Sequence, residues 1–212
     1  MNSTNRVGRF WVRVPVYGLF VFAGLYFIAT ILYPGGSQAD NAEKEFSWLN
    51  NYWCDLLSEK SKNGLDNTAR PVAVISWLIL CFSLSVFWYF LPVLFLISAA
   101  AKNLIRFTGI IAMLIAAFLF TSLHDVVIHS AGLFGFIAFT GTFAGLYKTG
   151  LYGFFYSGLF CLALMVLNYG IMVGNTLIFY LPLVQKVTFV FVLIWIYFIH
   201  RKLILFFSEG DP

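Results

Sequence analysis

Six long apolar runs constrain this sequence more than any other feature. Each has about the ~20 residues that a helix needs to cross the hydrocarbon of a bilayer. Of the 212 residues, 61% are hydrophobic and 10% are charged, whereas a soluble domain has about a quarter charged residues. A water-soluble fold of this length could not bury so much Phe, Leu and Ile. The sequence therefore predicts an all-α membrane protein, a bundle of six transmembrane helices forming a single domain over residues 1–212. The expected spans are residues 14–33, 71–96, 104–123, 126–147, 151–173 and 183–204.

A single long connection follows the first span. Pro34-Gly35-Gly36 ends that span, and the connection continues to Arg70. Within it, residues 46–57 (FSWLNNYWCDLL) place apolar side chains mostly three or four positions apart, which is typical of one face of a helix. Trp and Tyr settle at headgroup depth. We therefore expect one interfacial amphipathic helix after the first span.

The charges predict an orientation. The two ends of the chain and the connections after spans two and four carry mostly bases, whereas the long connection carries six acids and four bases. Basic residues favour the cytoplasmic side. The sequence therefore predicts a multi-pass protein of the bacterial cytoplasmic (inner) membrane, with both termini cytoplasmic and residues 34–70 facing outward.

The stretch Thr121–Ser130 (TSLHDVVIHS) places two of the three histidines and a carboxylate where two apolar runs meet. Ionisable groups bordering hydrocarbon are costly unless they are paired, hydrated or used, so His124, Asp125 and His129 are candidate functional residues. Asp125 and His129 are four positions apart, close enough on one helix face for a carboxylate–imidazole contact. His124 and His129 are five apart and do not form the i, i+4 pair of a zinc site borne on a helix.

The predicted topology brings further polar residues to the same outer leaflet, because each lies near an outward end of its segment. We therefore expect a polar pocket there with a larger set of ligand-binding candidates. These are Asp55, Arg70, His124, Asp125, His129, Asn168 and Lys186.

Several of these residues also have structural interpretations. Asp125 can cap the fourth span, and His129 can be a hydrogen-bonded interhelical residue. We expect Lys186 to extend its ammonium to the headgroups, with a role in the pocket as the alternative. Gly141 and Gly145 form a GxxxG pair, which favours close approach of the fourth span to a neighbouring helix.

Other motifs do not add a reaction. The sequence contains no GxGxxG, Walker-type, HExxH or GxSxG motif. It has three cysteines without a CxxC pair, and Cys54 is expected to be an unpaired interfacial thiol. The sequence has no basic patch of the kind that would indicate nucleic-acid binding.

Two short motifs resemble a known family. Cys54-Asp55-Leu56-Leu57 after the first span, followed by Leu123-His124-Asp125 at the fourth, is similar to the domain-of-unknown-function 998 family of six-span bacterial membrane proteins. Members have Ser before and Leu-Gly after the first Asp, and this chain departs at both flanks. The resemblance implies a six-span fold and no particular reaction.

A more distant resemblance is to the alkaline ceramidase-like transmembrane hydrolases. Those enzymes hold zinc with three histidines, aided by Ser and Asp, near one membrane face. The resemblance implies that Asp55, Ser122, His124 and His129 could supply part of such a set. His200 is expected at the opposite face, so the third histidine is missing.

The sequence leaves three functions open, and whether the protein is an enzyme is uncertain. The first is an outward polar pocket that binds a lipid headgroup, a small polar ligand or a membrane partner. The second is a metal-dependent intramembrane hydrolase of a lipid amide or ester, which alone would require zinc; its candidate catalytic residues are His124, Asp125, His129 and Asp55. The third is a proton-coupled transporter using the pair Asp125 and His129.

Overall fold

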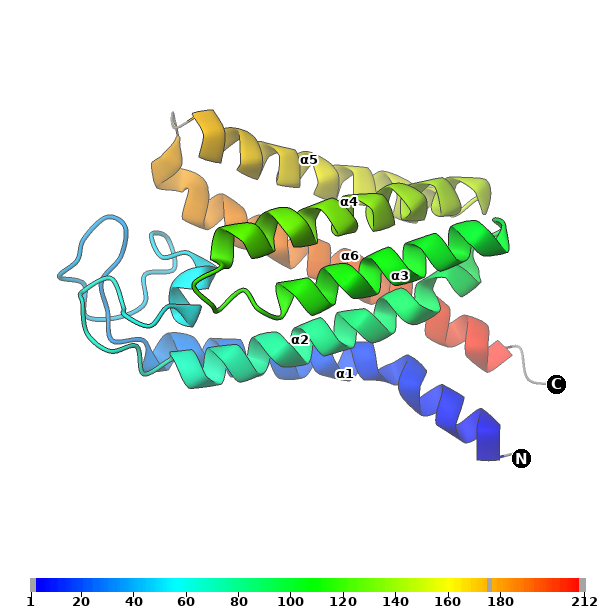
Figure 1. The fold of residues 1–212 in the computed structure, drawn as a ribbon, viewed down its shortest axis with the longest axis horizontal. Helices are drawn as coiled ribbons and strands as arrows, with labels where there is room; N and C mark the ends of the chain where they lie inside the picture. Colours follow the sequence, from blue (N-terminus) through cyan, green and yellow to red (C-terminus); the bar gives the residue numbers. More distant parts are fainter. Residues whose placement is uncertain (1–2, 175–176, 210–212) are drawn as a thin grey trace.

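The computed structural model describes residues 3–174 and 177–209 and shows long helices lying roughly along one axis (Figure 1). Six of them include a stretch long and apolar enough to cross a membrane, which confirms the predicted fold class. The long helices are α1 Ser3–Leu32, α2 Arg70–Phe90, α3 Ala99–Ala116, α4 His124–Lys148, α5 Tyr152–Gly174 and α6 Leu181–Glu209. Three short 3-10 helices accompany them: η1 Trp53–Leu57, η2 Leu91–Leu94 and η3 Ile178–Tyr180.

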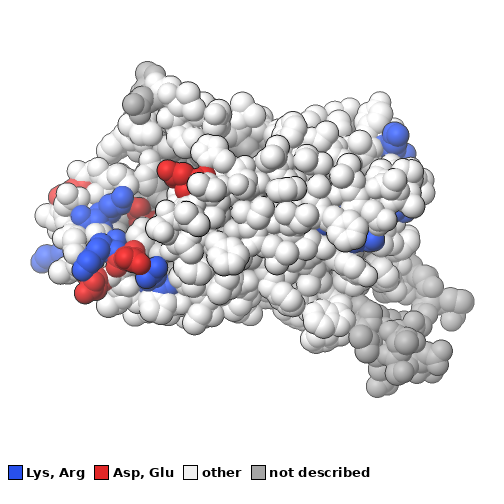
Figure 2. All heavy atoms as spheres, in the orientation of Figure 1, with Lys and Arg blue, Asp and Glu red and all other residues white. Residues whose placement is uncertain are grey.

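The helices form a ring in chain order. Each helix contacts the next one along the chain, and α6 closes the ring against α1. The α1–α2 loop (residues 33–69) covers one end of the bundle, and both ends of the chain lie at the other (Figure 1). On the face drawn in Figure 2, charged side chains gather at the two ends and leave a broad uncharged band between them. This distribution is what a membrane-spanning bundle requires.

The third span ends earlier than its hydropathy predicts. Helix α3 stops at Ala116, and residues 117–123 form a series of turns, the α3–α4 connection, instead of continuing the helix. Two side chains of α2 form hydrogen bonds with backbone carbonyls at this point. Trp77 donates Nε1–H to the Ala116 carbonyl at 2.7 Å, and Arg70 donates from Nη2 to the Phe120 carbonyl at 3.3 Å. The Ala116 carbonyl also accepts from the Leu119 backbone N–H at 3.1 Å, so both donors from α2 hold the turns that follow the last residue of α3.

The expected amphipathic helix over residues 46–57 is present only as η1, Trp53–Leu57. The preceding residues 46–52 form turns and irregular structure, and Asp55, Leu56 and Leu57 are buried. The apolar face of this segment packs into the bundle, because Trp53 contacts Tyr26 of α1 and Phe189 of α6 with ring centroids 5.0 and 6.3 Å apart. The segment is therefore part of the folded loop, and only its last five residues are helical.

Of the GxxxG pair of α4, Gly141 lies against a neighbouring helix as predicted, whereas Gly145 lies against the connection between η2 and α3. A Cβ added at Gly141 would lie 2.5 Å from Ile105 of α3, and one added at Gly145 would lie 2.5 Å from Phe95. Such distances leave no room for a side chain, so glycine permits the close packing of α3 and α4.

Candidate functional site

Asn51 is the centre of the α1–α2 loop and is completely buried. Its amide Nδ2 donates to the Gly36 carbonyl at 2.9 Å and to the Asp55 carboxylate at 3.1 Å. Its Oδ1 accepts from the Ser47 backbone N–H at 2.8 Å. One amide therefore holds three separate parts of the loop together, and buried polar groups require such partners.

Asp55 is buried with a side-chain exposure of 5%. Its Oδ2 accepts from Asn51 and from the backbone N–H of Tyr52, the latter at 2.8 Å. Its Oδ1 lies 3.4 Å from Nζ of Lys62, whose side chain is 37% exposed. The carboxylate is thus satisfied mainly by neutral N–H donors, and the ammonium of Lys62 remains partly in solvent.

Lys186 is buried, contrary to the expectation that it reaches the headgroups. Its ammonium donates to the carbonyls of Asn51 and of Pro182, the second at 3.1 Å, and lies 5.7 Å from the centroid of the Phe46 ring. Gln185, its neighbour, accepts from the Trp53 backbone N–H at 3.2 Å. Both side chains attach the loop to α6, and the contacts of Lys186 account for its burial.

Arg70 and Asn67 fasten the end of the loop. Arg70 donates from Nε to the Leu57 carbonyl at 3.1 Å and forms an ion pair with Glu59 at 3.3 Å, besides its bond to Phe120. Asn67 donates from Nδ2 toward three carbonyls of residues 55, 56 and 58, at 2.9 to 3.2 Å. The guanidinium of Arg70 therefore joins the loop to the α3–α4 connection.

The cluster at the start of α4 is arranged differently from the prediction. His129 Nδ1 lies 2.6 Å from the backbone carbonyl of Asp125, to which it can donate, so the expected contact with the carboxylate is not made. The Asp125 carboxylate lies instead 3.2 Å from Nδ1 of His124 and is 92% exposed. Asp125 is in the first turn of α4, and the N-cap position is occupied by Leu123. A carboxylate in this position interacts favourably with the helix dipole, although it does not cap a free N–H group of the helix.

One cavity of about 560 Å³ lies between the α1–α2 loop and the α3–α4 connection, and we call it the loop cavity. The loop contributes charged and polar side chains, among them Asp55, Glu59 and Lys62. The facing side consists of residues 119–122 and His124. One wall of the cavity therefore carries ionisable groups of both signs, and the opposite wall carries an imidazole.

The structure brings together only part of the predicted set. Asp55 and His124 line the loop cavity, and Arg70 braces it through its bonds to residues 57, 59 and 120. The residues that line it do not include Asp125, His129, Asn168 or Lys186. Asn168 joins α5 to α6 instead, because its Nδ2 donates to the hydroxyl of Thr188 and the carbonyl of Leu164.

The candidate metal ligands do not converge. Among the side chains that the structure describes, those of residues 10–174 and 177–208, no three His, Cys, Asp or Glu residues form a group that could hold a metal ion. His200 is fully buried on α6 and contacts the Val12 carbonyl of α1 through Nε2. It therefore lies toward the end of the bundle opposite the loop cavity, as the sequence predicts.

Cys54 lines the loop cavity as a free thiol. Burial, and to a smaller extent the neighbouring Asp55 carboxylate, raise the pKa of this thiol to about 11. Because the thiolate is the nucleophilic form, Cys54 is held in its unreactive state at neutral pH.

Sequence reasoning missed Asn51, Asn67, Lys62 and Gln185. Uncharged amides in a connecting segment carry no motif, and their role depends on which carbonyls the folded loop presents. The signal available was the presence of amides at residues 50, 51, 63 and 67 in a loop bounded by two apolar spans.

Comparisons of the chain with protein-family models, with curated proteins and with solved structures find no match. The interpretation of the loop cavity therefore depends on its own geometry.

Proposed function

We propose that this integral membrane protein binds the headgroup of a zwitterionic phospholipid in the loop cavity. The observation that carries the proposal is the composition of the two walls. One wall presents Lys62, Glu59 and Asp55, and the other presents His124 beside the apolar Leu119 and Phe120. A ligand that is charged at one end and apolar at the other suits such a cavity.

The charges support a role for each group. Asp55 already accepts two N–H donors, so Lys62 can turn its ammonium toward a phosphate without leaving that carboxylate unpaired. His124 can add a second donor for the phosphate. The Glu59 side chain is 79% exposed and can accept from the ammonium of the headgroup. Phe118 and Leu123 adjoin the lining residues 119–122 in sequence, and both are exposed, which favours contact with acyl chains.

We further propose that the loop cavity faces outward from a bacterial inner membrane and that both ends of the chain are cytoplasmic. The support is the distribution of bases, because Lys102, Lys148, Arg201 and Lys202 belong to the opposite end of the bundle. In a chain without its three native cysteines, a membrane-impermeant maleimide applied to intact cells should label the Lys60→Cys variant and spare the Lys148→Cys variant. The reverse labelling would invert the proposed orientation.

Native mass spectrometry of the purified protein titrated with short-chain phosphatidylethanolamine tests the headgroup site. Lys62→Ala and His124→Ala should each weaken binding about tenfold, the size expected for one charged hydrogen bond. Two matched controls change residues that lie outside the cavity. Lys60→Ala removes a lysine that pairs with Asp66 at 2.6 Å, and His129→Ala removes a second histidine of α4. Equal binding by all four variants would remove the proposed site.

The hydrolase and transporter alternatives gain no specific support from the arrangement of the described residues. A hydrolase would need a third metal ligand beside Asp55 and His124, and the described side chains do not form such a group. A relay between Asp125 and His129 would need their side chains to meet, whereas His129 contacts the main chain of Asp125.

A further inference from the structure

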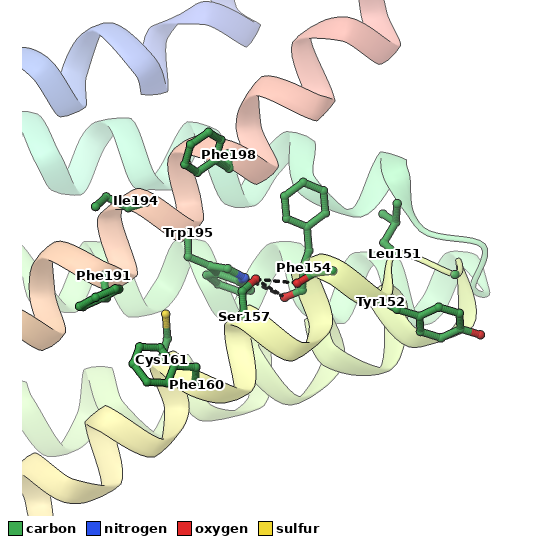
Figure 3. Close-up of a pocket in the computed structure, with 12 residues that line it drawn as sticks. Leu151, Tyr152, Phe154, Ser157, Phe160, Cys161, Phe191, Ile194, Trp195 and Phe198 are labelled. Carbon is green, nitrogen blue, oxygen red and sulfur yellow. Dashed lines mark hydrogen bonds between the residues drawn. The ribbon is translucent and has the colours of Figure 1, made fainter.

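A second cavity of about 520 Å³ lies between α5 and α6, and we call it the α5–α6 groove. Figure 3 shows Ser157, Phe160 and Cys161 on α5 facing Phe191 and Trp195 on α6. Its walls are largely aromatic and aliphatic. It extends from residue 150, where α5 is about to begin, and so lies in the half of the bundle away from the loop cavity.

Two polar side chains of the α5–α6 groove, Trp195 and Ser157, have partners within the protein. Trp195 donates Nε1–H to the Phe154 carbonyl at 2.9 Å. The Ser157 hydroxyl donates to the Gly153 carbonyl at 2.8 Å and lies 3.3 Å from that of Phe154 (Figure 3). An apolar chain can therefore lie against these two side chains without leaving either donor unpaired in hydrocarbon.

The groove face of α6 changes from apolar to cationic along its length. Phe191, Ile194, Trp195 and Phe198 line the groove at spacings of three, one and three residues. Arg201 and Lys202 follow Phe198 by three and four positions, so they continue the same helix face. Both are exposed, and the bond from Arg201 Nη1 to the Tyr197 hydroxyl at 3.2 Å uses one of the five N–H donors of its guanidinium.

We propose that the α5–α6 groove binds an anionic phospholipid, with one acyl chain between the helices and the headgroup phosphate against Arg201 and Lys202. The charge complementarity at the end of the groove selects an anionic over a zwitterionic lipid. This site is independent of the loop cavity, because the two cavities share no lining residue.

Fluorescence quenching by phospholipids brominated on their acyl chains tests this proposal, because Trp195 lies in the groove wall. The part of the signal that is lost in Trp195→Phe reports on the groove. In vesicles, brominated phosphatidylglycerol should quench this part at a lower mole fraction than brominated phosphatidylcholine. Lys202→Gln should reduce the preference about fivefold, the size expected for one basic side chain near an anionic surface. Lys102→Gln is the matched control, with the same charge change at the same end of the bundle.

A groove-filling variant keeps the test independent of the headgroup. Ser157→Phe should abolish Trp195 quenching by both lipids while the protein stays monodisperse and helical in detergent. Equal quenching by the two lipids, or equal loss of preference in Lys102→Gln, would overturn the proposal. An absence of quenching by either lipid in the unaltered protein would show that another helix or a second copy covers the groove, and would overturn it as well.

Discussion

The α1–α2 loop and the start of α4 lie at the same end of the bundle, yet they hold their ionisable groups in opposite ways. The side chain of Asp55 is 5% exposed and accepts two N–H donors, whereas that of Asp125 is 92% exposed and contacts only its neighbour His124 among the described residues. Both carboxylates have partners close by in sequence: Asn51 and Tyr52 lie within four residues of Asp55, and His124 adjoins Asp125. Spacing along the chain therefore does not distinguish the two regions, whereas the burial of Asp55 and the exposure of Asp125 do.

The largest effect expected from this difference is at the centre of the loop. Asn51→Ala removes three side-chain hydrogen bonds and leaves buried groups of Gly36, Asp55 and Ser47 without that partner. We expect a loss of about 3 kcal/mol in the free energy of unfolding, measured by denaturant titration in detergent. Asn50→Ala is the matched amide control. A similar loss in both variants would mean that the network does not set the stability of the loop.

The second prediction uses the thiol inside the loop cavity. Since the pKa of Cys54 is raised from 9.0 to about 11, the neutral thiol is favoured, and its alkylation at pH 8 should be about a hundredfold slower than that of an unperturbed thiol. The rate should still rise about tenfold per pH unit between pH 9 and 10, where an unperturbed thiol levels off. Iodoacetamide labelling followed by mass spectrometry in a Cys81→Ala, Cys161→Ala background measures it.

The exposed Ser58 provides the control for that labelling. Ser58→Cys, in a chain that also has Cys54→Ala, places a thiol on the same cavity without the burial. If this thiol and Cys54 reacted at the same rate, burial would not protect the native residue.

The third prediction compares two glycines of α4. Gly141→Ala should lower the free energy of unfolding by about 1–2 kcal/mol, because the added Cβ would lie 2.5 Å from Ile105. Gly135→Ala should not destabilise, since no atom lies within 4 Å of a Cβ built there. Thermal unfolding followed by size-exclusion chromatography distinguishes the two. Equal effects would show that helix propensity and not packing governs α4.

The smallest effect is expected at the start of α4. His129→Ala and Asp125→Asn should each change the free energy of unfolding by less than about 0.5 kcal/mol, as exposed substitutions usually do. The same denaturant titration as for Asn51→Ala measures this. A loss comparable to that of Asn51→Ala would place these residues in the structural network.

The number and approximate positions of the spans could be predicted from sequence because hydropathy alone decides which segments cross a bilayer. The end of α3 could not. Phe118, Leu119 and Phe120 continue the apolar run, and the helix stops earlier where Trp77 of α2 donates to its last carbonyl. That donor comes from another helix, so nothing local to the span announces it.

The candidate site was predictable in part. Asp55 and His124 were identified as ionisable groups near hydrocarbon, and both line the loop cavity. Lys186 was expected to extend its ammonium to the headgroups because lysines near span ends usually do. It is buried because the folded loop presents the Asn51 carbonyl above it, an arrangement that depends on the conformation of residues far away in the chain.

That contact has a consequence for how the protein is made. Lys186 follows Asn51 by 135 residues and Trp53 precedes Gln185 by 132, so the loop emerges from the ribosome long before the helix that secures it. During insertion, the first five spans are therefore made before the loop can form its hydrogen bonds with α6. Release of the final span from the translocon is then the step that joins the early and late parts of the polypeptide.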